Sequence, residues 1–556
     1  MGAIRDLADR HLDEQIALDP MLATYKGVPG HDHELTDFSP DGLAERDSLA
    51  RRTLARLADL EPADDADRRC GELLASRLAN DIARHDAGED LRPLRVIGSP
   101  VGALRAVFDL TRRDTDDDWA TVTCRIAAVP EAYARLRTSL SSGMSADLFA
   151  APRQALACAV QAATWAGIES GTTPWFAQYV AAGPASLRTE LGRAAVAATD
   201  ALADFAAWLR ETYVPAAAGT PDAVGADRYA LAAAGTLGAR LDIGEAYGWA
   251  WDELVRIETE MVDVAQRLVP DGSIADAFEH LDTAGPAIDG AENLRAWLQD
   301  LVDRTVDELG VAHFAIAAPL RRCEVMIAPP GTAAAQYYTA PTADFSRPGR
   351  TWNPTMGRTR FPTWGEVSTC YHEAVPGHHL QLAQWVHRAP QLSQFQTTAY
   401  VSGNIEGWAL YAERLMDELG ALDDPGYRLG YLVAQQLRAT RVIVDIGMHH
   451  GLRFPDGQPF HVGEVMTPEL GREFLFQHAG KERDFLDSEW VRYLGWPSQA
   501  ICYKLGERVW LAGRDAASRR AAREGRAFDL KAWHAAALDL GSTGLDALAE
   551  TLPTIG

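Results

Sequence analysis

The sequence predicts a mainly helical protein of two lobes with a small β-sheet. Apolar residues recur every three or four positions through most of the chain, which is the spacing of a helix face. Short apolar runs interrupt this pattern after residue 312. The 556 residues are enough for more than one lobe. We expect an N-terminal helical lobe over 1–310 and a second region over 311–556, whose elements interleave around one deep central cleft.

The first 310 residues form a succession of predicted helices rich in Ala, Leu and Arg, which favour helix. Pro152, Pro174, Pro184 and Pro215 separate these segments. No glycine-rich phosphate loop follows a strand pattern, so the sequence does not predict a nucleotide-binding core. The clearest helical segments are residues 49–60, 71–85, 119–127, 131–140 and 195–213.

Four short apolar runs predict strands, because each is rich in β-forming residues and bounded by turn signals. They lie over 313–317, 323–328, 336–341 and 350–354. A small sheet is therefore expected directly before a helix that begins near Thr363. From there, helical spacing continues to about residue 548.

Composition excludes several kinds of partner. The chain has 53 Lys and Arg against 78 Asp and Glu, a net charge of -25. Nucleic-acid phosphates would be repelled, and no basic cluster offsets this, so no nucleic-acid partner is expected. No apolar run reaches the roughly 18 residues of a membrane span, so no membrane partner is expected. Six scattered cysteines without a C-x-x-C pair, and a charged start without an apolar leader, predict the cytoplasm.

The most informative stretch is 372–379, which reads His-Glu-Ala-Val-Pro-Gly-His-His. A zinc-peptidase helix usually reads H-E-x-x-H, with two histidines four apart on one face and a glutamate beside the metal. Pro376 occupies the place of the second histidine and has no group that binds a metal. Histidines follow two and three positions later, as His378 and His379. The stretch therefore predicts a zinc site only if the backbone is distorted at Pro376.

On an unbroken helix, neither His378 nor His379 could share an ion with His372. A residue six positions on lies roughly 120° around the helix, and one seven positions on lies roughly 10 Å along it. Pro376 removes a backbone N–H and Gly377 has the freest backbone, so the pair predicts a kink or an inserted turn. His378 needs the smaller insertion and is the preferred ligand, with His379 as the alternative. The competing interpretation is that Pro-Gly ends the helix and both histidines lie on the surface.

A second cluster lies about thirty residues downstream, in Asn404–Glu413. Glu406 and Glu413 are seven apart on one helix face, among aromatic and apolar residues that predict burial. A buried carboxylate needs a partner, and one class of zinc hydrolases takes its third ligand from a second helix. Glu406 is the predicted ligand, since Gly407 beside it lets the backbone approach a metal. Glu413 is predicted to hold a histidine or an arginine. The alternative is an amphipathic helix whose glutamates face water.

A polar stripe follows on the otherwise apolar segment 437–450. Arg438, Arg441, Asp445 and His449 are spaced three, four and four apart, which places them along one helix face. A structural ion pair between Arg441 and Asp445 explains this pattern as well as function does. The functional interpretation is a wall of the active site, where Arg441 or His449 binds a carboxylate or a developing oxyanion.

The last segment with candidate residues is 492–506. Pro497 is predicted to begin a helix that carries Tyr503. Tyr503 or Tyr493 could donate a hydrogen bond to a tetrahedral intermediate, although most such tyrosines only pack. Tyr503 is the candidate that we retain.

Together these segments resemble a bacterial family called domain of unknown function 885. Its pattern combines Tyr-His-Glu-Ala-x-Pro-Gly-His-His, Glu-Gly-Trp-Ala-x-Tyr-x-Glu, Arg-x-x-x-Asp-x-Gly-x-His and Pro-x-Gln-Ala-x-x-Tyr-Lys-x-Gly. That family is similar to helical gluzincin peptidases such as angiotensin-converting enzyme and neurolysin. The segment from Asn404 is also similar to the third-ligand motif of aminopeptidase N-like enzymes, with Ile405 inserted. The resemblance covers at least 310–510, and the matching segments are Tyr371–His379, Glu406–Glu413, Arg441–His449 and Pro497–Gly506.

The resemblance implies a zincin-like fold and a zinc-dependent metallopeptidase acting on short peptides. Zinc would be held by His372, His378 and Glu406. Glu373 would take a proton from the bound water and return it to the leaving amine. The strand near 336–339 would pair with an extended peptide substrate. The residues expected to contact substrate or oxyanion are Arg441, His449 and Tyr503.

Two other functions stay open on sequence grounds. One is a non-enzymatic relative, in which the Pro-Gly insertion has abolished metal binding and the cleft holds peptides or serves as a scaffold. The other is a metal-dependent hydrolase of a non-peptide amide or ester. Metal analysis distinguishes the non-enzymatic relative from a zinc peptidase. Assays with peptide, amide and ester substrates distinguish the non-peptide hydrolase from a peptidase.

Overall fold

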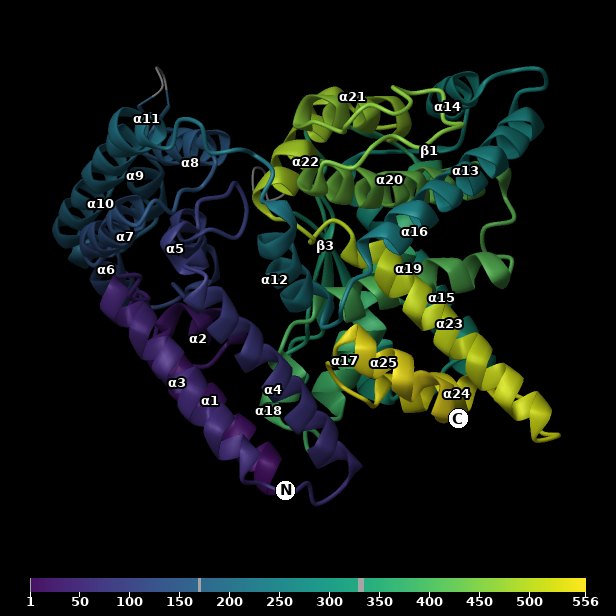
Figure 1. The fold of residues 1–556 in the computed structure, drawn as a ribbon, viewed down its shortest axis with the longest axis horizontal. Coiled ribbons are helices and arrows are strands. Elements are labelled where there is room, and N and C mark those ends of the chain that lie inside the picture. The colour runs from purple at the N-terminus through teal and green to yellow at the C-terminus, as the bar shows by residue number, and fades with distance from the viewer. Residues whose placement is uncertain (1, 169–171, 329–334) are drawn as a thin grey trace. The chain divides into compact units, whose positions relative to one another are not determined.

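The computed structural model describes residues 2–168, 172–328 and 335–556, and these ranges are mainly helical with two small sheets (Figure 1). They form two compact units, each described by itself: an N-terminal unit and a second unit. The N-terminal unit comprises 2–231 and 487–497, and the second comprises 232–486 and 498–556. Packing thus groups residues from 232 onward with the later part of the chain, whereas the sequence texture changes near 310. No helix in the described ranges is long and apolar enough to cross a membrane.

The N-terminal unit is a set of helices that pack around clusters of buried apolar side chains, as the helical spacing predicts. Several helices begin with Ser-Pro: Ser39 and Ser99 each accept a hydrogen bond from a backbone N–H in the first turn, and the following proline starts the helix. Fully buried Phe108 lies in the core, with the Phe176 and Tyr179 rings 5.4 and 5.8 Å away. The elements are α1 (Ala3–Leu18), α2 (Pro20–Lys26), α3 (Pro40–Ala58), α4 (Asp65–Asp86), α5 (Pro100–Leu110), α6 (Asp116–Ala127), α7 (Val129–Ser145), α8 (Pro152–Trp165), α9 (Trp175–Val180), α10 (Arg188–Trp208) and α11 (Val214–Ala216), with turns η1 (Glu89–Leu91), η2 (Ala185–Leu187) and η3 (Leu209–Tyr213).

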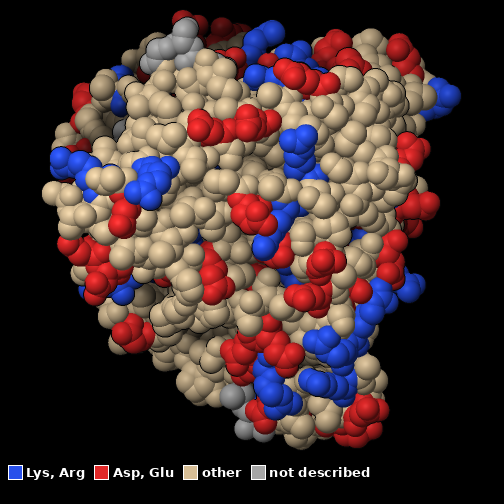
Figure 2. Space-filling view, turned by 90° about the vertical axis from the view of Figure 1, so that its left-hand side faces the viewer, with Lys and Arg blue, Asp and Glu red and all other residues tan. Residues whose placement is uncertain are grey.

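The outer helix faces carry charges of both signs. Arg135 and Glu131 pair one helical turn apart on α7, and Arg51 and Asp47 do the same on α3. Figure 2 shows Lys and Arg interspersed with Asp and Glu over the face that it displays. The excess of acidic residues is therefore partly balanced locally on that face.

The second unit contains the predicted His-Glu helix and the helices that follow it. Within this unit α13 packs along α20, and α19 packs along α23. The helices α12 and α22 cross the boundary between the two residue sets. The elements are α12 (Gly225–Leu237), α13 (Ile243–Leu268), α14 (Ile274–Thr283), α15 (Ala291–Ala312), α16 (Val367–Glu373), α17 (His378–His387), α18 (Gln394–Thr398), α19 (Ser402–Glu418), α20 (Pro425–His450), α21 (Pro468–His478), α22 (Arg483–Gly495), α23 (Cys502–Arg523), α24 (Leu530–Leu538) and α25 (Leu545–Thr551), with turns η4 (Ala318–Arg321), η5 (Thr363–Gly365) and η6 (Leu552–Thr554).

Two small sheets precede α16. Strands β2 (Cys323–Ile327), β4 (Gly349–Asn353) and β3 (Tyr337–Thr339) form one sheet in that order, with β2 parallel and β3 antiparallel to β4. Strands β1 (Ala287–Asp289) and β5 (Arg360–Pro362) pair antiparallel in the other sheet. The predicted strands over 323–328, 336–341 and 350–354 are confirmed, and β3 and β4 contact α17.

The strand predicted over 313–317 is wrong. The backbone N–H groups of His313 and Phe314 both donate to the carbonyl of Leu309, so this run completes the end of α15. Its apolar character comes from Phe314, which is buried against the His534 ring at a centroid distance of 4.3 Å. A short apolar run fits a buried helix end as well as a strand, which is why spacing alone misassigned it.

His534 is a buried neutral base within this aromatic cluster. Its Nε2 lies 2.7 Å from the Tyr411 hydroxyl and its Nδ1 lies 3.0 Å from the His313 carbonyl, so an uncharged ring satisfies both neighbours. Burial lowers the pKa of His534 to about 3, against an ordinary 6.5. The unfolded chain therefore takes up a proton that the folded chain excludes, and stability falls as the pH drops from about 6.5 toward 3.

We expect this group alone to cost roughly 1.4 kcal/mol of unfolding free energy per pH unit in that window. Urea unfolding at pH 7 and pH 5 tests it, with His534→Gln as the comparison. Glutamine keeps a donor and an acceptor but does not titrate, so its stability should depend less on pH. Equal pH slopes for the two proteins would contradict the assignment.

Candidate metal centre

The His-Glu helix is broken where Pro376 and Gly377 predict. Helix α16 ends at Glu373 and α17 begins at His378. Two backbone hydrogen bonds close the intervening turn. The Gly377 N–H donates to the carbonyl oxygen of Tyr371, and the His379 N–H donates to the carbonyl oxygen of Ala374. The break is therefore an inserted turn between two helical segments, and the helix resumes after it.

Trp408, for which the sequence predicts no role, holds this turn. The indole N–H of Trp408 lies 3.0 Å from the carbonyl oxygen of Pro376 and 3.1 Å from that of Gly377. Trp408 is fully buried on α19, two residues after Glu406. One short helical stretch thus supplies both a candidate metal ligand and the donor that fixes the turn. A broken helix leaves backbone carbonyls that need donors, and a buried indole N–H needs an acceptor. These two needs together could have predicted the contact between Trp408 and the turn.

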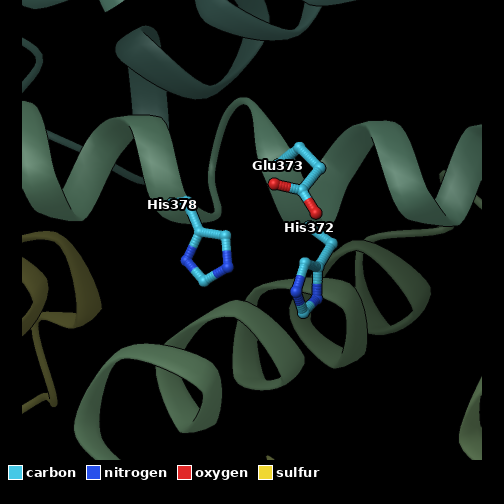
Figure 3. Close-up of side chains that lie close together, drawn as sticks. All are labelled: His372, Glu373 and His378. Atoms are coloured by element: carbon cyan, nitrogen blue, oxygen red, sulfur yellow. The ribbon is translucent and has the colours of Figure 1, made fainter. Parts of the chain in front are cut away.

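The inserted turn brings His372 and His378 together. Their ring centroids lie 4.7 Å apart, and both side chains are buried. Figure 3 shows the two imidazoles projecting from the two helix segments into the same space, with the Glu373 carboxylate beside them. One donor atom from each of these three residues lies within 4.8 Å of the others.

Glu406 reaches the same point from α19. Its Oε2 lies 3.5 Å from Nε2 of His372 and 3.4 Å from Nε2 of His378. Donors bound tetrahedrally at about 2.0–2.2 Å lie roughly 3.3–3.6 Å apart, so this spacing suits one zinc ion. Burial opposes ionisation, but hydrogen bonds with both histidines hold the pKa of Glu406 well below its usual range. We therefore assign Glu406 as the third candidate ligand and place Glu373 beside the centre.

A second carboxylate orients His372 from behind. Glu413 Oε1 lies 2.8 Å from Nδ1 of His372, while its Oε2 accepts a 2.6 Å hydrogen bond from Ser368. Arg438 Nη1 lies 3.1 Å from the same Oε1, so Glu413 holds both a histidine and an arginine, as predicted. With its Nδ1 proton donated to Glu413, His372 directs Nε2 toward Glu406, and this nitrogen can bind a metal ion once its own proton is lost.

The surroundings of His372 favour positive charge at this point. Burial lowers its pKa, yet hydrogen bonds with Glu406 and Glu413 outweigh burial and raise the pKa to about 9. Two carboxylates converging on one imidazole are costly unless a proton or a metal ion compensates them. A set of two imidazole nitrogens and one carboxylate oxygen is also a donor set that zinc takes. The residues present therefore fit a zinc ion.

His379 points elsewhere. Its Nδ1 lies 3.0 Å from the Tyr338 hydroxyl on β3, and its Nε2 lies 2.9 Å from the Leu320 carbonyl. Burial lowers its pKa to about 4, so the ring is neutral and both nitrogens have partners. Of the two histidines that the sequence left open, His378 joins His372 and His379 connects α17 to the small sheet.

Glu373 lies beside the two histidines with its side chain buried. Among the described residues, none forms a hydrogen bond with its carboxylate. A carboxylate with free acceptor positions next to a metal-type donor set can take a proton from water, provided that water reaches it.

The other predicted site residues fall into two groups. Tyr503 is near the centre, since its ring stacks on His372 at 6.5 Å and lies under the guanidinium of Arg441 at 5.0 Å. His449 lies two turns beyond Arg441 on α20, with Nε2 4.0 Å from Asp445. Tyr493 belongs to the N-terminal unit and donates to Glu489 at 2.7 Å. The structure thus brings Tyr503 and Arg441 to the centre, and places His449 and Tyr493 in other contacts.

Gly407 has a different role from the one expected. A Cβ there would lie 2.5 Å from the backbone of Gly506 on α23, and a Cβ on Gly506 would overlap α19 in return. The expected close approach is therefore between two helices and not between backbone and metal. It explains why the Glu-Gly-Trp and Tyr-Lys-x-Gly segments each carry a glycine facing the other.

Comparison with known proteins adds a family and a fold. The family of bacterial proteins of unknown function DUF885 matches residues 20–552. No protein of curated function matches the chain.

Two solved structures share the fold. The putative lipoprotein from Colwellia psychrerythraea has a TM-score of 0.84 at 19% identity, covering 99% of this chain and 98% of that one. A putative lipoprotein of unknown function from Shewanella oneidensis has a TM-score of 0.74 at 18% identity, covering 99% of both chains. A carboxypeptidase of Pyrococcus furiosus reaches a TM-score of only 0.24, too low to support a shared fold.

Proposed function

Since the chain belongs to the DUF885 family of bacterial proteins of unknown function, we propose that it is a zinc-dependent peptidase whose metal is held by His372, His378 and Glu406. One observation carries the proposal. Two Nε2 atoms and one carboxylate oxygen, drawn from three helices, converge at 3.4 and 3.5 Å although six residues separate the histidines. The distances are those of ligands around one ion, and Glu413 orients His372 for that role.

The chemistry proposed is hydrolysis of an amide bond. When bound, zinc supplies a Lewis acid for the carbonyl oxygen and lowers the pKa of water. Glu373 accepts the proton of the attacking water and delivers it to the nitrogen as the carbon–nitrogen bond breaks. Tyr503 lies close enough to His372 to donate a hydrogen bond to the carbonyl oxygen.

Two features support peptides as the substrates. The four motifs match the DUF885 pattern, and that family resembles helical zinc peptidases, so we propose a zincin-like relationship on that basis. In addition, β3 pairs with β4 on one side and has no second neighbour among the described strands. An edge strand next to a metal centre suits an extended peptide, which would add as a further strand.

For location we propose the cytoplasm, because all six cysteines are free thiols. The lipoprotein names of the two structural neighbours make the cell envelope the competing location. Fractionation of cells decides between the two.

Zinc analysis of the purified protein tests the assignment. We expect about one zinc per chain in the wild type, and loss of that zinc in His372→Ala and in Glu406→Ala, because each removes one of three ligands. His387→Ala is the matched control, since it removes a histidine at the far end of α17. Retained zinc in both ligand variants would overturn the assignment.

A further inference from the structure

His379 ties the first turn of α17 to the small sheet, although it is not one of the three candidate ligands. The residue is 1% exposed, and both ring nitrogens have partners. Nε2 lies 2.9 Å from the carbonyl oxygen of Leu320 in η4, and Nδ1 lies 3.0 Å from the hydroxyl of Tyr338 on β3. Both partners lie outside α17, and the residue that they hold is the direct neighbour of His378.

The direction of these two hydrogen bonds follows from their partners. A backbone carbonyl only accepts, so Nε2 of His379 carries a proton and donates it to Leu320. Nδ1 of the neutral ring then accepts the proton of the Tyr338 hydroxyl. Removal of that hydroxyl would leave Nδ1 as a buried acceptor without a donor, which is unfavourable.

The backbone of the sheet encloses the contact between Tyr338 and His379. Gly349 begins β4, and a Cβ at this position would overlap both the Tyr338 hydroxyl and Nδ1 of His379. The two rings also meet edge to face, with their centroids 5.6 Å apart. The hydroxyl and the imidazole therefore occupy a space that a side chain at Gly349 would fill, and the sheet fixes where they lie.

This attachment restrains the rotation of α17 about its own axis. Successive helix residues point about 100° apart, so His378 faces the centre while His379 faces the sheet. A second attachment runs to α19, where Gln381 donates to Oδ1 of Asn404 at 3.1 Å, and both residues are 1% exposed. Attachments in different directions hold a short helix against rotation. Loss of the one to the sheet would therefore leave His378 less firmly directed at the centre.

We propose that Tyr338 is a positioning residue of the metal centre, which holds His378 in place through its hydrogen bond to His379. This role rests on the proposed zinc site and deepens it. Tyr338 lies on β3, the strand assigned above to the peptide, and β3 pairs with β4 alone among the described strands. The strand that would receive the substrate thus also supports the turn that carries a ligand.

Cobalt(II) is the probe for this role, because its visible absorption depends on the coordination geometry, whereas zinc has no visible band. Tyr338→Phe removes one oxygen atom and keeps the ring. We expect this variant to bind cobalt with a shifted and weaker visible band than the wild type. In competition with a chelator, it should bind zinc at least about tenfold more weakly, which is the usual effect of removing support from behind a ligand.

Tyr411→Phe is the matched control, because it removes the same kind of hydrogen bond. The Tyr411 hydroxyl lies 2.7 Å from Nε2 of His534, whose Nδ1 lies 3.0 Å from the carbonyl of His313. Tyr411 also lies on α19, the helix that carries Glu406. The control should lose stability as Tyr338→Phe does, yet keep the cobalt spectrum and the zinc affinity of the wild type.

His379→Leu is a second variant, which removes both hydrogen bonds at once and should change the cobalt spectrum at least as much. A spectrum and zinc affinity equal to the wild type in Tyr338→Phe would overturn the positioning role and leave the zinc site standing. The same spectral change in Tyr411→Phe would also overturn it, because loss of any buried Tyr–His bond would then suffice.

The proposed function fails in a different way. Altered cobalt binding by Tyr338→Phe, in a protein whose wild type hydrolyses no peptide, would support the positioning role and count against the peptidase. A wild type that binds neither zinc nor cobalt would overturn both.

Discussion

Replacing Glu373 with glutamine is expected to abolish peptide hydrolysis while leaving zinc bound. The side chain is buried beside His372 and His378, and glutamine has nearly the same shape but takes no proton at neutral pH. A general base contributes about 10²–10⁴-fold, so kcat should fall by that factor. Zinc content by atomic emission and kcat by chromatography, on the same preparation, give both quantities.

Glu418→Gln is the matched control for this experiment. Glu418 ends α19 and pairs with Arg514, three turns beyond Glu406. It should leave both zinc content and kcat as in the wild type. If Glu373→Gln kept full activity, Glu373 would not be the base, and the mechanism would need another proton acceptor.

Replacing Gly377 with alanine is expected to disrupt the centre from the backbone side. A Cβ at this position would overlap the carbonyl oxygens of His372 and Tyr371, closer than real Cβ contacts come. The inserted turn would have to open, and His378 would move away from His372. We expect a loss of about 3 kcal/mol or more in unfolding free energy, together with weaker zinc binding.

Gly365→Ala provides the comparison, because a Cβ there meets no atom within 4 Å. It lies in η5, just before α16, so it tests the same region without the overlap. Urea unfolding and zinc titration of both variants measure the difference. If Gly377→Ala had the same unfolding free energy and the same zinc affinity as Gly365→Ala, the turn would be shown to tolerate a side chain.

Local patterns in the sequence predicted most of the secondary structure. Helical spacing identified the segments over 71–85 and 119–127, which lie within α4 and α6, and the segment over 49–60, which extends two residues past the end of α3. Three of the four predicted strands are present, since β-rich runs bounded by turn residues are recognisable over a few positions, whereas the three-residue strands β1 and β5 were not predicted. The failure at 313–317 arose because burial of Phe314 by α24 gives an apolar run without a strand.

The sequence could predict those candidate residues whose side chains can themselves bind a metal or transfer a proton. His372, Glu373 and Glu406 carry groups that bind metal or move protons, and the Pro-Gly pair signalled a broken helix. The role of Gly407 was not predictable, because the helix that it contacts begins almost a hundred residues later. The partnership of Trp408 with the Pro376 carbonyl was hidden for the same reason.

The sequence by itself determined that the chain is mainly helical, that a small sheet precedes the His-Glu helix, and that this helix breaks at Pro376-Gly377. Those features depend on neighbouring residues along one chain segment. Only the tertiary structure decided that His378 and not His379 faces His372, because a Tyr338 hydroxyl and a backbone carbonyl hold His379. Such pairings depend on contacts between distant segments, which packing sets and spacing along the sequence does not.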